Sequence, residues 1–359
     1  MPRALRWSRV LSSCVCAVLA ATAVTTAVAA PASAAPTLSW QLRDTGGTNH
    51  FRGLAAVDSR TAWVSGYEGQ VLRTTDGGTT WQDVSPTGLG TEKLQFRDIE
   101  AFGAGRAVVM AAGPGGLSRL LLTEDGGATW TQRYRNSTAG AFFDCMAFSD
   151  AQHGLVMSDP VNGRFRILST GDGGRSWTVL PNTGMPKAQP GEAGFAASGQ
   201  CLAVSGDDAW FGSGGGAVAR IYHSTDRGLT WSATASTLTS TASGGVFGLA
   251  FSTPSRGVVV GGDFADATRS TRTAATQLAG GAWRPSTTMP SGYRSGVSFV
   301  PGTAGTVLAV GLTGSDVSYD GGRTWATFDT GQFDTVECVA GGACWAAGDK
   351  GRVAVLRRS

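Results

Sequence analysis

The chain has 359 residues, of which 53 are glycine and only 15% are charged. Such a composition is typical of a turn-rich globular protein with a large apolar core. The formal net charge of +3 equals the number of arginines in the N-terminal segment, Arg3, Arg6 and Arg9, so the rest of the chain is formally neutral. A neutral chain is not expected to coat nucleic acid, and we predict no nucleic-acid partner.

The N-terminal segment has the features of a secretory signal peptide. Its three arginines precede an apolar stretch over residues 10–29, and Ala32-Ser33-Ala34 follows as a small-residue cleavage site. A retained membrane anchor is the alternative that the length permits. The Ala- and Thr-rich content and the cleavage site favour a signal over residues 1–34. We therefore expect a secreted protein, without stable membrane insertion after cleavage, that consists of residues 35–359.

A short turn pattern recurs along the rest of the chain. It reads Ser/Thr-x-Asp-x-Gly-x-Thr/Ser-Trp, and its five copies are centred on Asp76, Asp125, Asp172, Asp226 and Asp320. The Asp carboxylate can accept backbone hydrogen bonds within a tight turn, and the Gly suits a positive φ. An apolar run precedes each copy and the Trp begins the returning strand. We predict a structural role for all five aspartates, because an active site is not normally built five times.

The spacing of the copies predicts a β-propeller. A decayed copy without Asp ends at Trp283, and the repeat period is then 42 to 54 residues. This length suits four short strands and their turns. Seven apolar strand openings, from Phe51 in the first unit to Phe333 in the last, predict seven units. The expected fold is all-β, a single seven-bladed β-propeller of four-stranded blades.

The last unit lacks its own fourth strand. The chain ends after the predicted third strand at residues 351–356, whereas Ser39-Trp40-Gln41-Leu42 matches the start of an ordinary fourth strand. We predict that this N-terminal strand completes the last blade and closes the ring, which removes an open sheet end.

The repeats resemble the Asp-box, or BNR, repeats of sialidase-like propellers. The whole unit, with openings such as Phe96-Arg97-Asp98-Ile99, resembles the photosystem II stability/assembly factor family of seven-bladed propellers over residues 37–359. This resemblance implies a non-enzymatic protein that binds a partner during assembly of a membrane complex. A sialidase-like glycoside hydrolase and a carbohydrate-binding propeller without turnover are the alternatives. The Phe/Tyr-Arg-Ile-Pro opening usual in sialidases is broken here at Gly53-Leu54.

The face opposite the Asp-box turns is the expected working face. Arginines begin strands on that face: Arg52, Arg97 and Arg294 in first strands, and Arg119, Arg166, Arg220 and Arg352 in third strands. Arginine recognises carboxylate and phosphate groups through two-point hydrogen bonding, and a cluster attracts anions. We therefore predict a partner that is an anionic protein segment or glycan. The alternative is that arginine is simply the preferred basic residue, since the chain has only three lysines.

The remaining candidates are cysteines that could form disulfides and histidines that could bind a metal ion. Cys338 and Cys344 flank a short turn and are predicted to form a disulfide. Cys145 and Cys201 occupy the same register of neighbouring blades, so we predict buried free thiols. The three histidines lack metal-ligand spacing, and we expect no metal or cofactor and a monomeric protein.

Acidic residues also fall in the predicted first strands, close to the axis. A carboxylate pair for glycoside hydrolysis could be drawn from them, although nothing in the sequence selects one pair. These residues are Asp98, Glu100, Asp144, Asp334 and Glu337.

Overall fold

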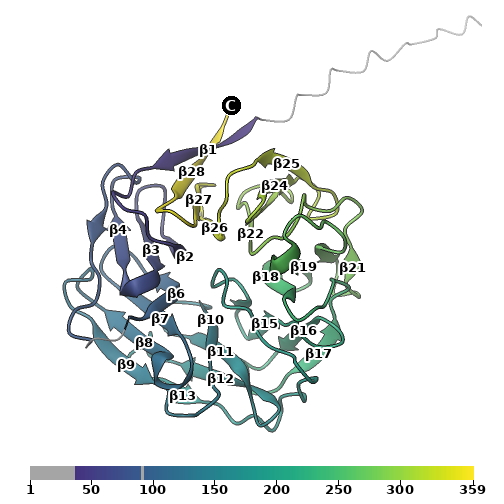
Figure 1. Cartoon of the computed structure of the whole chain (residues 1–359), viewed down its shortest axis with the longest axis horizontal. Coiled ribbons are helices and arrows are strands. Elements are labelled where there is room, and N and C mark those ends of the chain that lie inside the picture. Colours follow the sequence, from purple (N-terminus) through teal and green to yellow (C-terminus); the bar gives the residue numbers. More distant parts are fainter. Residues whose placement is uncertain (1–36, 90–92) are drawn as a thin grey trace, which may run out of the picture. The chain divides into compact units, whose positions relative to one another are not determined.

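The computed structural model describes residues 37–89 and 93–359, and the chain from Thr37 to Ser359 forms one compact unit. In this unit, seven sheets of four antiparallel strands follow one another around a ring (Figure 1). The predicted all-β, seven-bladed propeller is confirmed. The predicted signal peptide lies outside the described residues. Within the described ranges, no helix has the length and apolar character needed to cross a membrane.

The first blade contains β2 (Phe51–Ala56), β3 (Ala62–Gly66), β4 (Val71–Thr74) and β5 (Gln82–Asp83). The second contains β6 (Gln95–Ala101), β7 (Ala107–Ala112), β8 (Arg119–Thr123) and β9 (Thr131–Arg135), and the third β10 (Phe143–Phe148), β11 (Gly154–Val161), β12 (Arg164–Thr170) and β13 (Thr178–Val179). The fourth contains β14 (Leu202–Ser205), β15 (Asp208–Gly212), β16 (Arg220–Ser224) and β17 (Ser232–Ala235).

The fifth blade contains β18 (Gly244–Thr253), β19 (Arg256–Asp263), β20 (Ala274–Gln277) and β21 (Arg284–Pro285). The sixth contains β22 (Gly296–Phe299), β23 (Val307–Gly311), β24 (Gly314–Ser318) and β25 (Ala326–Asp329). The seventh contains β26 (Thr335–Cys338), β27 (Cys344–Ala347), β28 (Val353–Arg358) and β1 (Leu38–Arg43). The first strands of successive blades contact one another around the ring, so they line the axis.

The N-terminal strand closes the ring, as predicted. Strand β1 pairs with β28 over its full length, from Leu38 opposite Arg358 to Arg43 opposite Val353. The buried ring of Trp40 packs against Phe328 and Phe333, and its Nε1 donates a hydrogen bond of 2.9 Å to Ser315 Oγ in blade six. Closure therefore joins the two ends of the propeller through both a strand ladder and a buried side chain.

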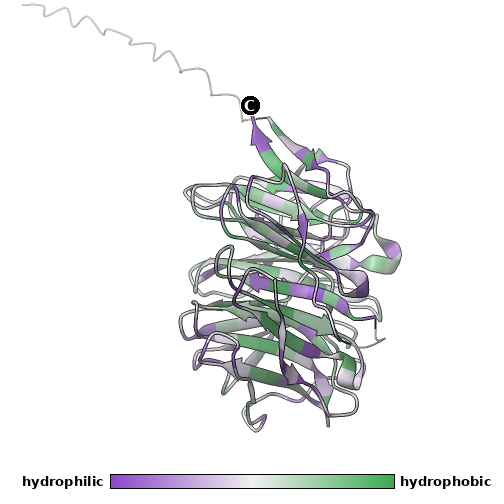
Figure 2. Cartoon of the chain, turned by 90° about the vertical axis from the view of Figure 1, so that its left-hand side faces the viewer, coloured by the Kyte–Doolittle hydropathy of each residue, from purple (hydrophilic) through white to green (hydrophobic). Residues whose placement is uncertain are grey.

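The core lies between neighbouring blades. Because each sheet is covered on both faces, its middle strands are continuously apolar rather than alternating. All six residues of β7 are buried, for example, and Figure 2 shows hydrophobic residues along the strands of the stacked blades. Large aromatic side chains fill the spaces between blades, among them the fully buried Trp63 and Trp345.

The five Asp-box turns share one hydrogen-bond pattern. Asp76 Oδ1 accepts hydrogen bonds from Thr80 N (2.9 Å) and Thr74 Oγ1 (2.8 Å), and Oδ2 accepts one from Thr80 Oγ1 (2.7 Å). Gly78 has a φ of 79° and donates its N–H to Thr74 Oγ1. The same bonds recur in the other four boxes, around Asp125, Asp172, Asp226 and Asp320. Each carboxylate is thus saturated by its own turn.

The two disulfides give one confirmation and one correction. Cys338 and Cys344 are bonded, with Cα atoms 4.0 Å apart, as predicted. The prediction of free thiols at Cys145 and Cys201 is wrong, because these residues form a second disulfide with Cα atoms 5.7 Å apart. They do not share a register: Cys145 follows a β-bulge in β10, and Cys201 precedes β14, which begins only at Leu202. The side chain of Cys201 therefore meets blade three.

Candidate functional site

A pocket of about 300 Å³ opens at the axis on the face opposite the Asp-box turns. First strands start on that face, and the pocket contains residues near the starts of three of them. These are Arg52 in β2, Arg97 in β6 and Asp334 immediately before β26. We call it the axial pocket. Its remaining lining residues are Phe195, Ala196, Ala197, Phe247, Phe264, Tyr293 and Leu312.

The floor of the axial pocket is a segment that crosses the axis, residues 196–200, which we call the axial segment. Ala196 O accepts hydrogen bonds from Arg97 Nη1 (3.1 Å) and Arg52 Nη1 (3.4 Å), in blades two and one. On the other side, Ser198 Oγ donates to Ser295 O (2.7 Å). Gln200 Nε2 donates to carbonyls in blades six and seven, at Val297 and Val336. The segment therefore spans the centre of the ring that Figure 1 shows from above.

Close contact with blade two requires glycine within this segment. Gly199 has a φ of 76°, and a Cβ atom there would lie 2.3 Å from Asp98 Oδ1. Any larger residue would push the segment away from the carboxylate, so the glycine lets the segment lie directly on blade two. The long loop between β13 and β14, at residues 182–195, leads into this crossing.

Two guanidinium groups lie side by side above the axial segment. The shared hydrogen-bond acceptor Ala196 O brings Arg52 and Arg97 together, and Gln95 Oε1 accepts from Arg97 Nε and Nη2 at 3.2 and 2.7 Å. Within residues 37–89 and 93–359, neither arginine has a carboxylate within ion-pairing distance. Burial, and then the positive charge of Arg52, lower the pKa of Arg97. An anion bound between them would relieve this repulsion.

The acid in the pocket is already engaged. Asp334 is buried, and its Oδ2 lies 2.8 Å from His50 Nε2. The other ring nitrogen of His50 lies 3.7 Å from Asp349 Oδ1. Because the histidine holds Asp334, this carboxylate does not bridge the two arginines.

The opposite wall of the pocket is aromatic. The rings of Phe195 and Phe247 stack at a centroid distance of 4.1 Å, and Tyr293 meets Phe247 edge-on at 4.7 Å. Phe264 also contacts Phe247 and is 50% exposed, which is unusual for so large an apolar side chain. An apolar surface beside a pair of cations can accept an apolar side chain next to a carboxylate.

Arg294 does not belong to this site, contrary to the sequence prediction. Its side chain is fully buried and pairs with buried Asp316, to which Nε donates at 2.6 Å. Further hydrogen bonds go to Ser291 and Thr313. Asp316 comes from the third strand of the same blade, so blade six neutralises its own arginine internally.

The third-strand arginines are dispersed over separate blades. Arg119 is buried and donates to Gly116 O, and Arg166 donates to Asn136 Oδ1. Arg220 is paired with Glu192 and also contacts Tyr222. Arg352 lines a different cavity. Of the seven predicted arginines, the structure places Arg52 and Arg97 together in the axial pocket.

The sequence did not identify the aromatic wall of the pocket. Phe195, Phe247 and Phe264 come from different loops and strands, and no spacing links them. The one signal was the length of the loop that ends at Phe195.

Beneath the axial segment, acidic side chains from blades two and seven approach the axis. Asp98 accepts hydrogen bonds from Ile99 N and Met146 N, and Glu337 Oε2 accepts one from Ala56 N at 2.6 Å. Burial raises the pKa of Glu337 to about 7. Burial, and then the charges of Asp98 and Glu337, raise the pKa of Glu100 well above its ordinary value. Within the described ranges, no group of three or more acidic, histidine or cysteine side chains could hold a metal ion.

Comparisons with known proteins agree with the fold. The model of the BNR/Asp-box repeat matches residues 222–233, which contain the fourth box. No curated protein sequence matches the chain. The structure described as "YCF48 bound to D1 peptide" is 17% identical, with a TM-score of 0.62 over 90% of this chain and 99% of that one.

Two further solved structures are similar. "YCF48 from Cyanidioschyzon merolae" is 15% identical, with a TM-score of 0.61 over 88% of this chain and 98% of that one. The WD40 β-propeller domain of Doa1 is 11% identical, with a TM-score of 0.56 over 89% and 97%. The predicted likeness to the assembly-factor propellers is thus found in the fold.

Proposed function

We propose that this protein is a non-enzymatic binding protein that holds an acidic segment of another protein in the axial pocket. The observation that carries this proposal is a pair of arginines, Arg52 and Arg97, that lie beside an aromatic wall and form no ion pair with any described residue. Guanidinium groups bind carboxylates through short, charge-assisted hydrogen bonds. The axial segment fixes their positions before a ligand arrives, so less conformational entropy is lost on binding.

The fold neighbours support a peptide as the ligand. A propeller of the same architecture, YCF48, has been solved with a peptide of D1 bound. Here the pocket mixes cationic and apolar lining, which fits a peptide with an acidic residue beside an apolar one. The predicted signal peptide at residues 1–34 and the two disulfides indicate that the protein acts in an oxidising compartment outside the cytosol.

The geometry favours this function over glycoside hydrolysis. A sialidase-like site needs three convergent arginines, and buried Arg294 cannot complete such a triad with Arg52 and Arg97. Asp334 supplies the one carboxylate among the lining residues, and it is held by His50. A two-carboxylate mechanism needs a second carboxylate within about 10 Å of Asp334, so that the two flank the scissile bond of the substrate. Asp98 lies beneath the axial segment, which separates it from the pocket mouth.

A peptide array tests the proposal. Residues 35–359 would be applied to acidic, basic and neutral synthetic peptides, beside a glycan array and a fluorogenic sialoside. We expect selective binding of acidic peptides. The double variant Arg52→Gln/Arg97→Gln should weaken that binding at least about tenfold, because each charge-assisted bond contributes roughly 1.5–3 kcal/mol.

The matched control removes the same charge elsewhere. Arg284 and Arg323 are exposed and lie outside the pocket, so Arg284→Gln/Arg323→Gln should bind acidic peptides almost as the wild type does. Equal loss in both double variants would mean a non-specific charge effect. Turnover of the sialoside, or selection of glycans without any acidic peptide, would overturn the proposal.

A further inference from the structure

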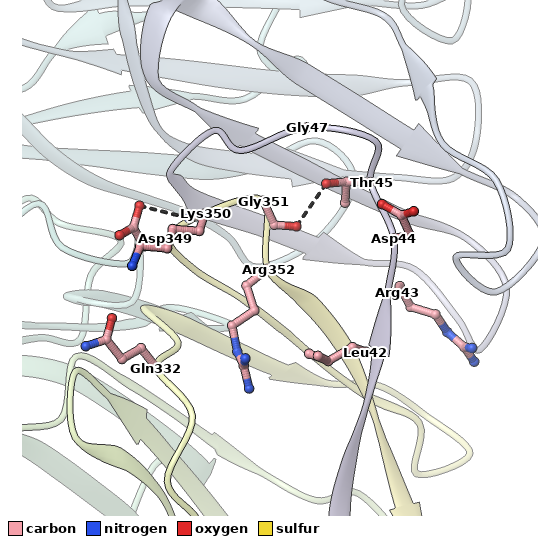
Figure 3. Close-up of a pocket in the computed structure, with 10 residues that line it drawn as sticks. All are labelled: Leu42, Arg43, Asp44, Thr45, Gly47, Gln332, Asp349, Lys350, Gly351 and Arg352. Carbon is pink, nitrogen blue, oxygen red and sulfur yellow. Dashed lines mark hydrogen bonds between the residues drawn. The ribbon is translucent and has the colours of Figure 1, made fainter.

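A second and larger cavity lies on the same face, at the seam where β1 closes the ring. Its volume is about 570 Å³, and we call it the blade-seven groove. Figure 3 shows its lining, which joins the end of β1 to the turn before β28. The residues that matter here are Leu42, Gln332, Asp349, Lys350 and Arg352.

Arg352 presents its guanidinium to this groove (Figure 3). Its planar group lies over the ring of Phe333 at 4.7 Å, which holds the long side chain in place. Its Nε is buried and has no hydrogen-bond partner in the described structure, and none of the ion pairs there includes Arg352. The guanidinium is therefore available to a carboxylate that enters the groove.

The two acidic residues that line the groove make their contacts with groups other than Arg352. Asp349 Oδ1 accepts from Lys350 N and faces His50, and Asp44 Oδ1 accepts from Gly46 N. Neither Asp349 nor Asp44 therefore forms an ion pair with Arg352. Beside it, Leu42 is 53% exposed and offers an apolar contact.

The groove and the axial pocket are neighbours. Gln332 lines the groove and Asp334 lines the pocket, and Phe333 between them carries Arg352 on its ring. His50 contacts Asp334 of the pocket at 2.8 Å and lies 3.7 Å from Asp349 of the groove. One extended chain can therefore cross His50 from one cavity into the other.

We infer that the blade-seven groove is a second subsite for the same acidic segment, with Arg352 binding a second carboxylate of that segment. This inference rests on the proposed function of the axial pocket. The ligand is an extended peptide with two acidic residues, the first at Arg52 and Arg97 and the second at Arg352. An apolar residue next to the second carboxylate lies against Leu42, and Lys350 adds to the positive field.

Peptides of two lengths can distinguish binding at the axial pocket alone from binding at both subsites. An acidic peptide selected on the wild-type protein would be cut to about six residues and compared with a version of about fourteen, since an extended residue spans about 3.3 Å. We expect the long peptide to bind about tenfold more tightly, measured by fluorescence anisotropy. Arg352→Gln should remove this gain and leave the affinity of the short peptide unchanged.

A second variant displaces the guanidinium without removing its charge. A Cβ atom at Gly331 would lie 2.0 Å from Arg352 Nη2, so Gly331→Ala should move that group and also reduce the gain from length. Arg166→Gln, in a distant blade, is the control and should change neither affinity. Loss of the gain in both groove variants supports the subsite.

The failures of the two proposals are distinguishable. If the long peptide keeps its tenfold gain in Arg352→Gln and Gly331→Ala, or shows none on the wild type, the second subsite is overturned while the axial pocket stands. If the short peptide binds Arg52→Gln/Arg97→Gln as tightly as the wild type, the axial pocket is not the site, and the inference fails with it.

Discussion

Three acidic residues on the axis should make the stability of the fold depend on pH. Asp98, Glu100 and Glu337 come from blades two and seven, and burial raises the pKa of each. An acid whose pKa is higher in the folded than in the unfolded state binds protons preferentially in the folded state. The contribution of these three groups to the stability of the propeller should therefore be greatest at acidic pH. It should fall as the pH rises from the ordinary carboxylate range of about 4 through about 7, the pKa of Glu337.

Glu100→Gln should weaken this dependence. The substitution removes the repulsion between Glu100 and its two acidic neighbours, so the variant should gain stability mainly above pH 7. We expect its melting temperature at pH 8 to rise by about 2–4 °C, which corresponds to roughly 1 kcal/mol in a domain of a few hundred residues. Thermal melts at pH 5 and pH 8 would measure the difference. The exposed Glu68→Gln is the control, and a Glu100→Gln variant that gains nothing at pH 8 contradicts the explanation.

Contacts between residues that are distant in sequence explain which parts of the site could not be predicted. The arginines were identified as a set because they begin strands on one face, and that reasoning found Arg52 and Arg97. It could not exclude Arg294, because its partner Asp316 lies 22 positions later and no local pattern links the two. Nor could it find Phe247 and Phe264, which become neighbours only when strand and loop are folded.

The axial segment does not belong to the repeat pattern, so the repeats could not predict it. The Asp-box copies fixed the strand order and the blade number, since each copy is a local strand–turn–strand unit. Residues 196–200 instead bond to blades one, two, six and seven, which are distant in sequence. The same crossing turns Cys201 toward blade three, and for this reason the prediction of two free thiols failed.

The Cys145–Cys201 disulfide should matter for binding as well as for stability. It anchors the residue that follows the axial segment, and Ala196 of that segment positions both arginines. Cys145→Ser/Cys201→Ser should lose about 2–4 kcal/mol of stability and bind the selected acidic peptide more weakly. Isothermal titration calorimetry below the melting transition would measure the affinity.

The other disulfide offers a matched control. Cys338 and Cys344 are six residues apart and staple a hairpin of blade seven on the Asp-box face. Cys338→Ser/Cys344→Ser should reduce stability and leave peptide affinity unchanged. If the two double variants bind the peptide equally well, the disulfide near the axis does not support the pocket.

At the scale of the whole molecule, stability depends on closure by β1. Deletion of residues 37–44 removes the ladder with β28 and the buried side chains of Leu38 and Trp40. The loss should reach several kcal/mol, because truncating one buried Trp to Ala already costs about 3–5 kcal/mol. Trp40→Ala should therefore show a smaller loss than the deletion. Chemical denaturation would measure the free energy of unfolding of the wild type, Trp40→Ala and the deletion variant. A deletion variant as stable as the wild type would contradict closure by β1.

Closure also explains why so much of the fold could be predicted. A missing fourth strand at one terminus and a spare one at the other are local features of the sequence, and the ring follows from joining them. The axial pocket requires in addition the three-dimensional meeting of blades one, two, five, six and seven with one loop. The repeat pattern identifies the blades but does not describe this centre.

The most direct test of the account is a crystal structure of residues 35–359 with the selected acidic peptide. We predict peptide density in the axial pocket, with a carboxylate within about 3.2 Å of guanidinium nitrogens of both Arg52 and Arg97, as charge-assisted hydrogen bonds require. An apolar side chain of the peptide should contact Phe247 or Phe264. A peptide bound on the Asp-box face, or in this pocket without any carboxylate at the two arginines, would contradict the account.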